Sequence, residues 1–318
     1  VRSTGGPASV TSSCSVVLIL STSFAIMPFH TDQFRISSGS SFRLKDHPTE
    51  LEEHLEKDEL KRLLEEDRAR IVDLQEALYA EGSRSLLLIF QAMDAAGKDS
   101  AIDHVLSGVN PQGCSVTSFK QPSSEELDHD FLWRHTRALP ARGMIGVHNR
   151  SHYEEVLVVK VHPEYLMGQR LPGITAPSDA GAAFWEQRYA SIRAWEAHAA
   201  ANGTTIMKFF LHMGKKEQKK RFLERIDGPK KNWKVSLGEI HERAHFADYM
   251  KAYEEAIRST AAPHAPWYVV PADEQWETRA IVGDLVRAQL EAMAPKVPEL
   301  SAKERDRLAE AKTLLAAE

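Results

Sequence analysis

The feature that most constrains this chain is a short, continuous apolar run, Leu86–Phe90, that ends just before a Gly-Lys pair. The segment Ala95–Lys98 follows closely, and a helical pattern then runs from Ser100 to Leu106. A buried strand, a tight loop and a helix in this order form a unit in which backbone N–H groups at the helix N-terminus cradle phosphate oxygens. The order of elements therefore predicts a phosphate-binding loop on a buried strand.

Four further short runs have the composition of β-strands, and each is separated from the next by a segment long enough for one or more helices. Such alternation is typical of parallel strands joined by crossover helices that cover both faces of a sheet. We therefore predict an α/β fold, a three-layer sandwich with a parallel sheet of about five strands and the active groups at the carboxyl ends of the strands. The four runs are Ser115–Phe119, Met144–Val147, Thr204–Leu211 and Trp267–Val270.

The other segments extend this domain. Apolar residues recur at helical spacing in the charged segment 49–81, which predicts a long amphipathic helix, and 163–181 is expected to be a connection. We expect 27–82 to be an N-terminal extension with that helix, 83–296 the phosphate-loop domain with a lid at about 213–236, and 297–318 a C-terminal helix. Residues 1–26 are expected to be disordered or to precede the true start at Met27. A secretory signal is the alternative, but no small-x-small cleavage site follows the apolar run.

Charge and cysteine content exclude several classes of protein. The formal charge of −5 argues against a nucleic-acid-binding domain, which is usually basic. The two cysteines, Cys14 and Cys114, lack the spacing of a disulfide framework or a zinc site. No run reaches the roughly 20 apolar residues of a membrane helix. We expect a cytoplasmic protein, with no membrane or nucleic acid as partner, whose basic surface is local.

The segment Ala92–Asp99 has the spacing of a Walker A loop but departs from it at both ends. Ala92 replaces the first glycine, and Asp99 replaces the hydroxyl residue that usually meets Mg²⁺. We expect Gly97 and Lys98 to bind phosphate, and Asp94 and Asp99 to supply oxygen ligands for Mg²⁺. Two alternatives stay open: a chance Gly-Lys turn at a helix start, and a helix-capping role for Asp99.

A second group of polar residues follows the strand Met144–Val147. Arg150 stands at the carboxyl end of this strand, where a guanidinium can pair with a phosphate through two parallel donors. His152 is expected to be a packing residue, because phosphoryl transfer to a phosphate acceptor needs no base.

A third group is strongly basic. Between Lys215 and Lys234 nine Lys and Arg stand against three Asp and Glu, a local charge of +6 that leaves −11 for the rest of the chain. We predict that this segment binds phosphate, and the alternative is a solvated helix face. The residues predicted to bind phosphate here and on the preceding strand are Lys208, Lys215, Lys216, Arg221 and Arg225.

Helical spacing divides the basic segment into two sides. Gln218, Arg221 and Arg225 share one face, at i, i+3 and i+7, and are predicted to face phosphate. The residues predicted to pack on the other side are Phe222, Leu223 and Ile226.

Taken together, the motifs resemble the polyphosphate kinase 2 family from about Phe34 to about Met293. The resemblance implies a P-loop kinase fold of the thymidylate-kinase-like type with a helical lid, Mg²⁺ as cofactor, and homo-oligomers. It implies inorganic polyphosphate and a nucleoside mono-, di- or triphosphate as substrates. The motifs are Gln91–Asp99, Ser107–Gln112, Ser118–Ser123, Asp130–Arg134, Asn149–Glu154, Glu217–Arg225, Ala265–Trp267 and Pro271–Asp273.

The resemblance also implies roles for single residues. Asp94, Lys98 and Arg150 match the catalytic positions, and Arg221 and Arg225 match lid positions. The residues implied to bind nucleotide are Lys120, Asn149, Arg150 and Glu154.

Asn149 and Glu154 stand where some members of the family have Asp and Asn. This version resembles the subgroup that accepts nucleoside monophosphates as well as diphosphates. Gln275 replaces a usual lysine, so a phosphate contact is expected to be missing there, whereas Arg279 matches the family.

We therefore expect direct, in-line phosphoryl transfer between polyphosphate and AMP or ADP, without a covalent enzyme intermediate. One alternative is an ATP-dependent nucleoside or nucleotide kinase of the same fold, but the run of nine cations suits a polymer better than a three-phosphate donor. The other is a non-catalytic polyanion-binding protein, in which Asp94 and Asp99 would repel the polyanion unless a metal ion lay between them.

Overall fold

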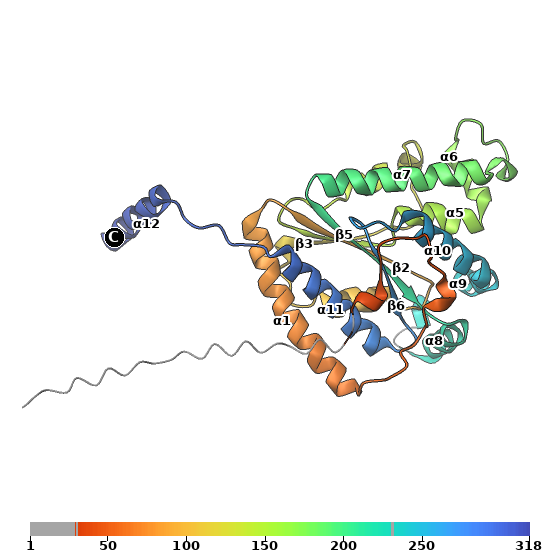
Figure 1. The fold of residues 1–318 in the computed structure, drawn as a ribbon, viewed down its shortest axis with the longest axis horizontal. Coiled ribbons are helices and arrows are strands. Elements are labelled where there is room, and N and C mark those ends of the chain that lie inside the picture. The colour runs from red at the N-terminus through yellow and green to blue at the C-terminus, as the bar shows by residue number, and fades with distance from the viewer. Residues whose placement is uncertain (1–28, 30, 230–231) are drawn as a thin grey trace, which may run out of the picture.

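A computed structural model of the chain describes residues 29, 31–229 and 232–318, and in this part six strands form one sheet (Figure 1). The order across the sheet is β1-β6-β5-β2-β4-β3. The expectation for residues 1–26 lies outside the described residues. The strands are β1 (Arg35–Ile36), β2 (Ser85–Ala92), β3 (Cys114–Ser118), β4 (Ile145–Asn149), β5 (Thr204–His212) and β6 (Trp267–Pro271).

The five strands predicted from the sequence are confirmed, and they pair in parallel. Strand β2 lies at the centre, where Leu88 stands opposite Val147 of β4 and Met207 of β5. The sixth strand, β1, was not predicted. It has only two residues, and Arg35 pairs antiparallel with Tyr268 of β6.

Side chains of β2 alternate between two hydrophobic cores, one on each face of the sheet. Leu86 and Leu88 belong to the core beneath α1, α2 and α11, whereas Leu87 and Ile89 belong to the core beneath α5, α7 and α10. The predicted three-layer sandwich is therefore confirmed (Figure 1). The covering helices are α1 (Lys57–Glu81), α2 (Lys98–Val105), α5 (Val158–Val161), α7 (Ala182–Ala201), α10 (Phe246–Thr260) and α11 (Gln275–Met293).

Helix α1 is the long amphipathic helix predicted over residues 49–81, but it begins at Lys57. It ends at Gly82, which has a φ of 62° and donates its N–H to the Leu78 carbonyl. A left-handed residue without a Cβ is the common way to stop a helix. Helix α1 packs along α11, where Arg287 binds Asp67 at 2.6 Å.

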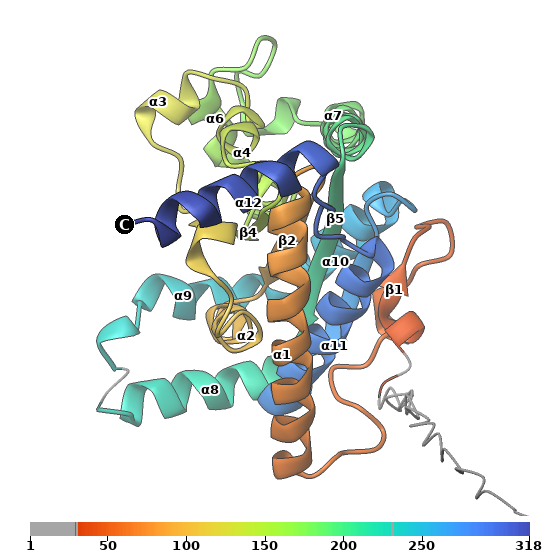
Figure 2. The ribbon, with the colours of Figure 1, turned by 90° about the vertical axis from the view of Figure 1, so that its left-hand side faces the viewer.

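Helix α8 (Lys215–Asp227) occupies the segment predicted as a lid, and α9 (Leu237–Glu242) follows directly after it. Figure 2 shows both helices, here called the lid helices, extending to the same side of the molecule. Of the three apolar residues predicted to pack, only Phe222 is buried, at 2% exposure. Leu223 and Ile226 are about half exposed, so that side of α8 faces solvent.

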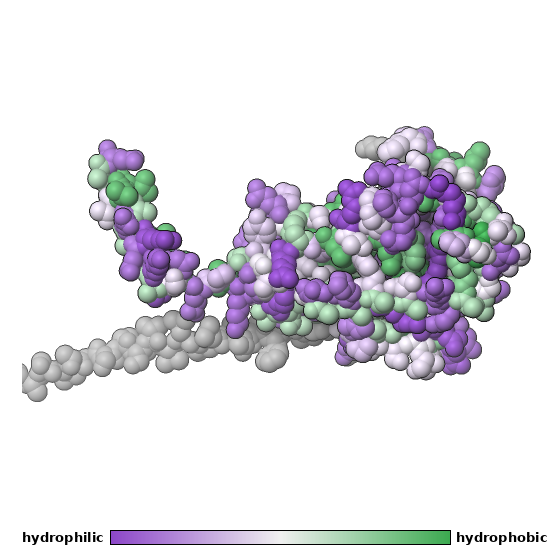
Figure 3. All heavy atoms as spheres, turned by 90° about the horizontal axis from the view of Figure 1, so that it is seen from above, coloured by the Kyte–Doolittle hydropathy of each residue, from purple (hydrophilic) through white to green (hydrophobic). Residues whose placement is uncertain are grey.

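The rest of the described chain consists of loops, 3₁₀ turns, short α-helices and one helix that stands apart. The short ones are α3 (Ser124–Leu127), α4 (Trp133–Arg137) and α6 (Leu166–Gln169), the last within the predicted connection. Helix α12 (Ala302–Ala316) projects from the body (Figure 1), and Figure 3 shows apolar side chains on it. No helix in the described part of the chain is long and apolar enough to cross a bilayer.

Candidate active site

The predicted phosphate loop and the segment that follows β4 meet in one cleft at the carboxyl ends of the strands. The cleft has a volume of about 660 Å³ and is walled by four parts of the chain: the loop after β2, the ends of β3 and β4, the lid helices and the start of α11. The predicted residues that line it are Asp94, Gly97, Lys98, Asp99, Lys120, Asn149, Arg150, Arg221 and Arg225.

The loop turns sharply before α2. Ala95 has a φ of 68° and Gly97, at the N-cap of α2, a φ of 99°. The Lys98 ammonium reaches back across the loop and donates to the Ala92 carbonyl at 2.7 Å. Burial and the nearby Arg150 lower the pKa of Lys98. Among the described residues, none accepts the backbone N–H of Gly97, Lys98 or Asp99, so these donors are available to an anion.

The two loop acids are held by the last residue of β4 and by the residue that follows it. Asp94 accepts from the Arg150 guanidinium at 2.8 Å, and Asp99 accepts from the Asn149 amide at 2.7 Å. In the described chain no three acids, histidines or cysteines cluster as metal ligands. Two carboxylates fit Mg²⁺, because this ion is usually held by one or two carboxylates together with substrate phosphates and water.

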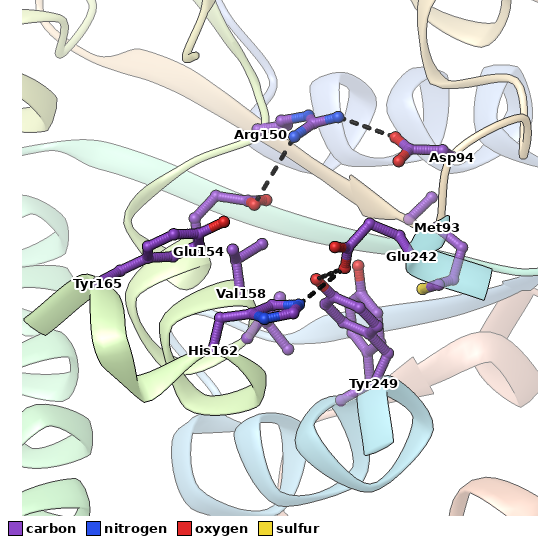
Figure 4. Close-up of a pocket in the computed structure, with 12 residues that line it drawn as sticks. Met93, Asp94, Arg150, Glu154, Val158, His162, Tyr165, Glu242 and Tyr249 are labelled. Atoms are coloured by element: carbon purple, nitrogen blue, oxygen red, sulfur yellow. Dashed lines mark hydrogen bonds and ion pairs between the residues drawn. The ribbon is translucent and has the colours of Figure 1, made fainter. Parts of the chain in front are cut away.

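Arg150 lies at the centre of the site (Figure 4). Its backbone has a φ of 62° and its N–H donates to the Phe90 carbonyl at 3.0 Å. Its guanidinium lies between Asp94 and Glu154, 3.9 Å from the latter. Burial raises the pKa of Glu154, and the charges of Arg150 and Lys98 oppose this rise. The left-handed backbone therefore turns one cation toward both acids.

Buried neighbours fix the short turn that carries Glu154. The Tyr153 hydroxyl donates to Glu196 at 2.7 Å, and Glu155 binds Arg188 at 2.6 Å. Because the residues on both sides of Glu154 are anchored in the helical layer, its carboxylate is directed into the site.

A second cavity, of about 380 Å³, opens beside Arg150. Of the four residues predicted to bind nucleotide, Lys120, Arg150 and Glu154 line this cavity, whereas Asn149 lines the phosphate cleft. The apolar walls of the 380 Å³ cavity include Phe119, Leu127, Val158, Val159 and Tyr165.

Arg134 also lines this cavity and donates to the Lys120 carbonyl at 2.9 Å. No role was predicted for Arg134 from the sequence, although the Asp130–Arg134 motif was a signal for it.

A third cavity, of about 210 Å³, lies between Arg150 and the lid (Figure 4). Glu242 of α9 accepts from Tyr249 at 2.8 Å and lies 2.9 Å from His162. Glu239, also on α9, lines the phosphate cleft. These acids were missed because the predicted lid ended at about residue 236 and was defined by its cations.

The lid cations have different surroundings. Lys215 and Lys216 are exposed and do not line the cleft. Arg225 lines it and binds Glu239 at 2.9 Å. Arg221, at 6% exposure, donates to carbonyls of the loop and not into open space. The face shared by Gln218, Arg221 and Arg225 does turn toward the site.

The phosphate-binding role predicted for Lys208 is wrong. This side chain is fully buried in the layer of α7 and α10. Its ammonium donates to Glu196 at 2.7 Å, to the Thr260 carbonyl at 2.9 Å and to the Tyr153 hydroxyl at 3.0 Å. These three partners use all the donors of an ammonium, so Lys208 cannot reach a phosphate.

His152 is also fully buried, and its ring packs against Trp195 and Tyr153. The packing role predicted for it agrees with these contacts.

Comparison with known proteins places this chain in a family. The chain is 50% identical over 283 residues to the ADP-polyphosphate phosphotransferase of Rhodopseudomonas palustris, covering 89% of this chain and 97% of that protein. It is 44% identical over 230 residues to the AMP/ADP-polyphosphate phosphotransferase of Meiothermus ruber, covering 72% and 80%.

A crystal structure of polyphosphate kinase 2 from Arthrobacter aurescens TC1 is similar, with a TM-score of 0.78 and 41% identity over 88% of this chain and 96% of that one. This likeness confirms the predicted P-loop kinase fold. The family model described as Polyphosphate kinase 2 (PPK2) matches residues 54–298. Because that match spans more than half of the sequence, the chain belongs to the polyphosphate kinase 2 family.

Proposed function

We propose that this protein transfers phosphoryl groups between inorganic polyphosphate and nucleotides, with AMP and ADP as acceptors. The observation that carries the proposal is the position of Arg150, at the junction of the phosphate cleft and the 380 Å³ cavity. A chain of phosphates in the cleft and a nucleotide in the cavity would meet at this guanidinium. Relatives named ADP- and AMP/ADP-polyphosphate phosphotransferases support the same reaction.

The residues of the cleft can hold the reacting phosphates without forming a covalent bond to them. The free N–H groups of Gly97 and Lys98 bind phosphate oxygens, and the Lys98 ammonium leaves the Ala92 carbonyl to neutralise their charge. Arg150 orients the acceptor phosphate through its paired donors. Transfer is then direct and in line, and positioning together with charge stabilisation supplies the catalysis.

Asp94 and Asp99 would hold Mg²⁺, which when bound neutralises charge on the phosphate oxygens. Asp94 already orients Arg150, so the same carboxylate serves both the acceptor side and the metal side of the cleft. From the family resemblance we also expect a homo-oligomer, and from the cysteine content a cytoplasmic protein.

The acceptor is proposed to be a nucleoside monophosphate or diphosphate. The 380 Å³ cavity lies within the usual volume range of small-molecule pockets and has apolar walls suited to a base. Glu154, which lines this cavity, is the residue by which we expect the protein to accept AMP as well as ADP.

The proposal is tested by incubating the protein with polyphosphate, Mg²⁺ and AMP or ADP, and separating the nucleotides. Formation of ADP and ATP is expected. ATP-dependent phosphorylation without use of polyphosphate would identify an ordinary nucleotide kinase, and binding without turnover would identify a polyanion-binding protein.

Lys98→Ala and Asp94→Asn are each expected to remove nearly all transfer activity and to leave the fold intact, because one loses phosphate neutralisation and the other loses a metal ligand. Asp103→Asn, an exposed acid on the same helix as Lys98, is the matched control and should keep activity. Folded variants that retain more than about a tenth of the wild-type rate, a deficit of only ~1.4 kcal/mol, would contradict these roles.

A further inference from the structure

Two side chains of α8 hold three consecutive backbone carbonyls of the phosphate loop. Gln218 donates its amide to the Asp94 carbonyl at 3.0 Å. Arg221 donates one guanidinium nitrogen to the Ala95 carbonyl at 3.3 Å and to the Ala96 carbonyl at 3.1 Å. Gln218 and Arg221 are 1% and 6% exposed, so these bonds are shielded from water. We refer to this pair as the carbonyl clamp.

Arg221 has no donor left for a substrate. Its second terminal nitrogen donates to the carbonyls of Ala272 and Asp273 at 2.6 and 3.0 Å, and its Nε donates to Glu217 at 3.0 Å. A guanidinium has five N–H donors, and five acceptors surround this one. A phosphate could bind Arg221 only if backbone carbonyls lost their hydrogen bonds to this guanidinium. Leaving a buried carbonyl without a hydrogen-bond donor is unfavourable in free energy.

The clamp acts on the part of the loop whose backbone conformation is least favourable without support from other residues. Ala95 adopts a left-handed backbone, with a φ of 68°, which costs a residue with a Cβ about 1 kcal/mol or more. Such a conformation persists only where surrounding contacts fix it. Because the carbonyls of Asp94, Ala95 and Ala96 are drawn toward α8, the N–H groups of Gly97 and Lys98 remain free to face the cleft.

We propose that Gln218 and Arg221 are positioning residues that keep the phosphate loop in its anion-binding conformation, and that Arg221 does not contact polyphosphate. This inference deepens the proposed function and rests on it. It replaces the lid-cation role that the sequence predicts for Arg221. Phosphate contact on α8 then belongs to the cations whose donors can reach solvent.

The clamp is itself held in place at the root of α8. Asp273 accepts the backbone N–H of Gly214 at 2.7 Å and the Thr49 hydroxyl at 2.6 Å. Arg243 donates to the Gln218 side chain at 2.8 Å, which orients its amide toward the loop. The first two turns of α8 therefore form part of the fixed wall of the site.

The first test reads the loop itself and needs no activity. Amide hydrogen exchange is measured in the full chain without substrate at Ala96 and Ala101, whose N–H groups donate to the Met93 and Gly97 carbonyls and so report on the loop. The proteins compared are the wild type, Arg221→Gln, Gln218→Met and Lys219→Gln. Exchange is expected to be about tenfold faster in both clamp variants, the factor for loss of ~1.4 kcal/mol of local stability. Lys219→Gln removes the same charge from an exposed position on the same helix and should leave exchange unchanged.

The second test separates positioning from contact. Arg221→Gln is expected to lower kcat about 100-fold, the usual scale for a misplaced site, with the slope of log KM for polyphosphate against log salt unchanged. Lys219→Gln should instead reduce that slope by up to about 1, as loss of a phosphate contact does, with kcat unchanged. Thermal denaturation identifies any variant that does not fold, and Gln218→Met then carries the test.

A reduced salt slope in Arg221→Gln, or loop exchange equal to that of the wild type in both clamp variants, would overturn the proposal. The two failures are distinguishable, because a wild-type protein that does not use polyphosphate refutes the proposed function while the exchange measurement still reports on the clamp.

Discussion

At the scale of single residues, Glu154 is an acid of the site whose carboxyl is largely withdrawn from water. Burial raises the pKa of its carboxyl, and the turn that carries it is anchored on both sides by Tyr153 and Glu155. A rigid, partly desolvated carboxylate discriminates well between acceptors, because a polar group left without its partner is costly.

We therefore expect Glu154→Asn to lower kcat/KM with AMP by about tenfold, and with ADP by much less. Glu164→Asn is the matched control, because Glu164 lines the same cavity but is largely exposed. The measurement is the initial rate with each nucleotide at a fixed polyphosphate concentration. Equal losses of kcat/KM with AMP and ADP would show that Glu154 does not select the acceptor.

Lys208 and Glu196 form a fully buried ion pair that lines none of the three cavities of the site. Lys208→Met leaves the Glu196 carboxylate without its cation, and such a change usually costs about 3–5 kcal/mol. The free energy of unfolding, measured with denaturant, should fall by that order. Adding Glu196→Gln should recover part of the loss, and a single variant as stable as the wild type would contradict this account.

At the scale of elements, helices α8 and α9 meet through opposite charges. Arg225 binds Glu239 at 2.9 Å, so a polyanion that uses Arg225 must first displace this carboxylate. Glu239→Gln is therefore expected to lower the KM for polyphosphate about two- to fivefold, since a partly exposed pair is worth up to ~1 kcal/mol. An unchanged or raised KM would show that the pair does not compete with the polymer.

The same pair gives a pH dependence. Burial and the nearby Asp94 raise the pKa of Glu239, so it takes up a proton at higher pH than an ordinary glutamate. As pH falls, the neutral carboxyl releases Arg225, and the KM ratio of wild type to Glu239→Gln should move toward 1. A ratio that grows as pH falls would have the wrong sign.

The sequence predicted elements better than it predicted contacts. Apolar runs located the strands at the centre of the sheet, because a strand buried on both faces is largely apolar. Strand β3 lies at the edge of the sheet and is partly exposed, so its β-forming residues and not an apolar run indicated it. Strand β1 has two residues, Arg35 and Ile36, which is too short for any periodic pattern. Lys208 was misassigned because its partner Glu196 lies on α7. The sequence of a strand does not indicate which side chain of a distant helix will pack against it. The shared face of Gln218 and Arg221 was correct, but what that face meets depends on loop carbonyls, which have no sequence signal.

At the scale of the whole molecule, positive charge is concentrated on α8 in a chain of net charge −5. If these cations follow a polymeric anion, the KM for polyphosphate should rise steeply as salt shortens the Debye length from ~30 Å at 0.01 M to ~8 Å at 0.15 M. The rise should be larger for long chains than for short ones. The exposed lysines expected to act together are Lys215, Lys216, Lys219 and Lys220.

The KM for AMP at saturating polyphosphate is the internal control for this experiment, because the acceptor cavity lies apart from those lysines. A polyphosphate KM that is indifferent to salt would mean that the basic face of α8 is only solvated.

Helix α8 supports the phosphate loop with one side and presents cations to solvent with another. Natural substitutions in this helix should therefore fall into two classes. Positions 218, 221 and 222, which meet buried neighbours, should tolerate almost no exchange. Positions 216, 219, 220 and 223 lie toward solvent and can drift in identity provided that positive charge is kept overall. Selection would then preserve the conformation of the phosphate loop strictly, but of the solvent-facing side of α8 only its total positive charge. Lineages whose polyphosphate differs in length could therefore change the residues on that side without altering the catalytic site.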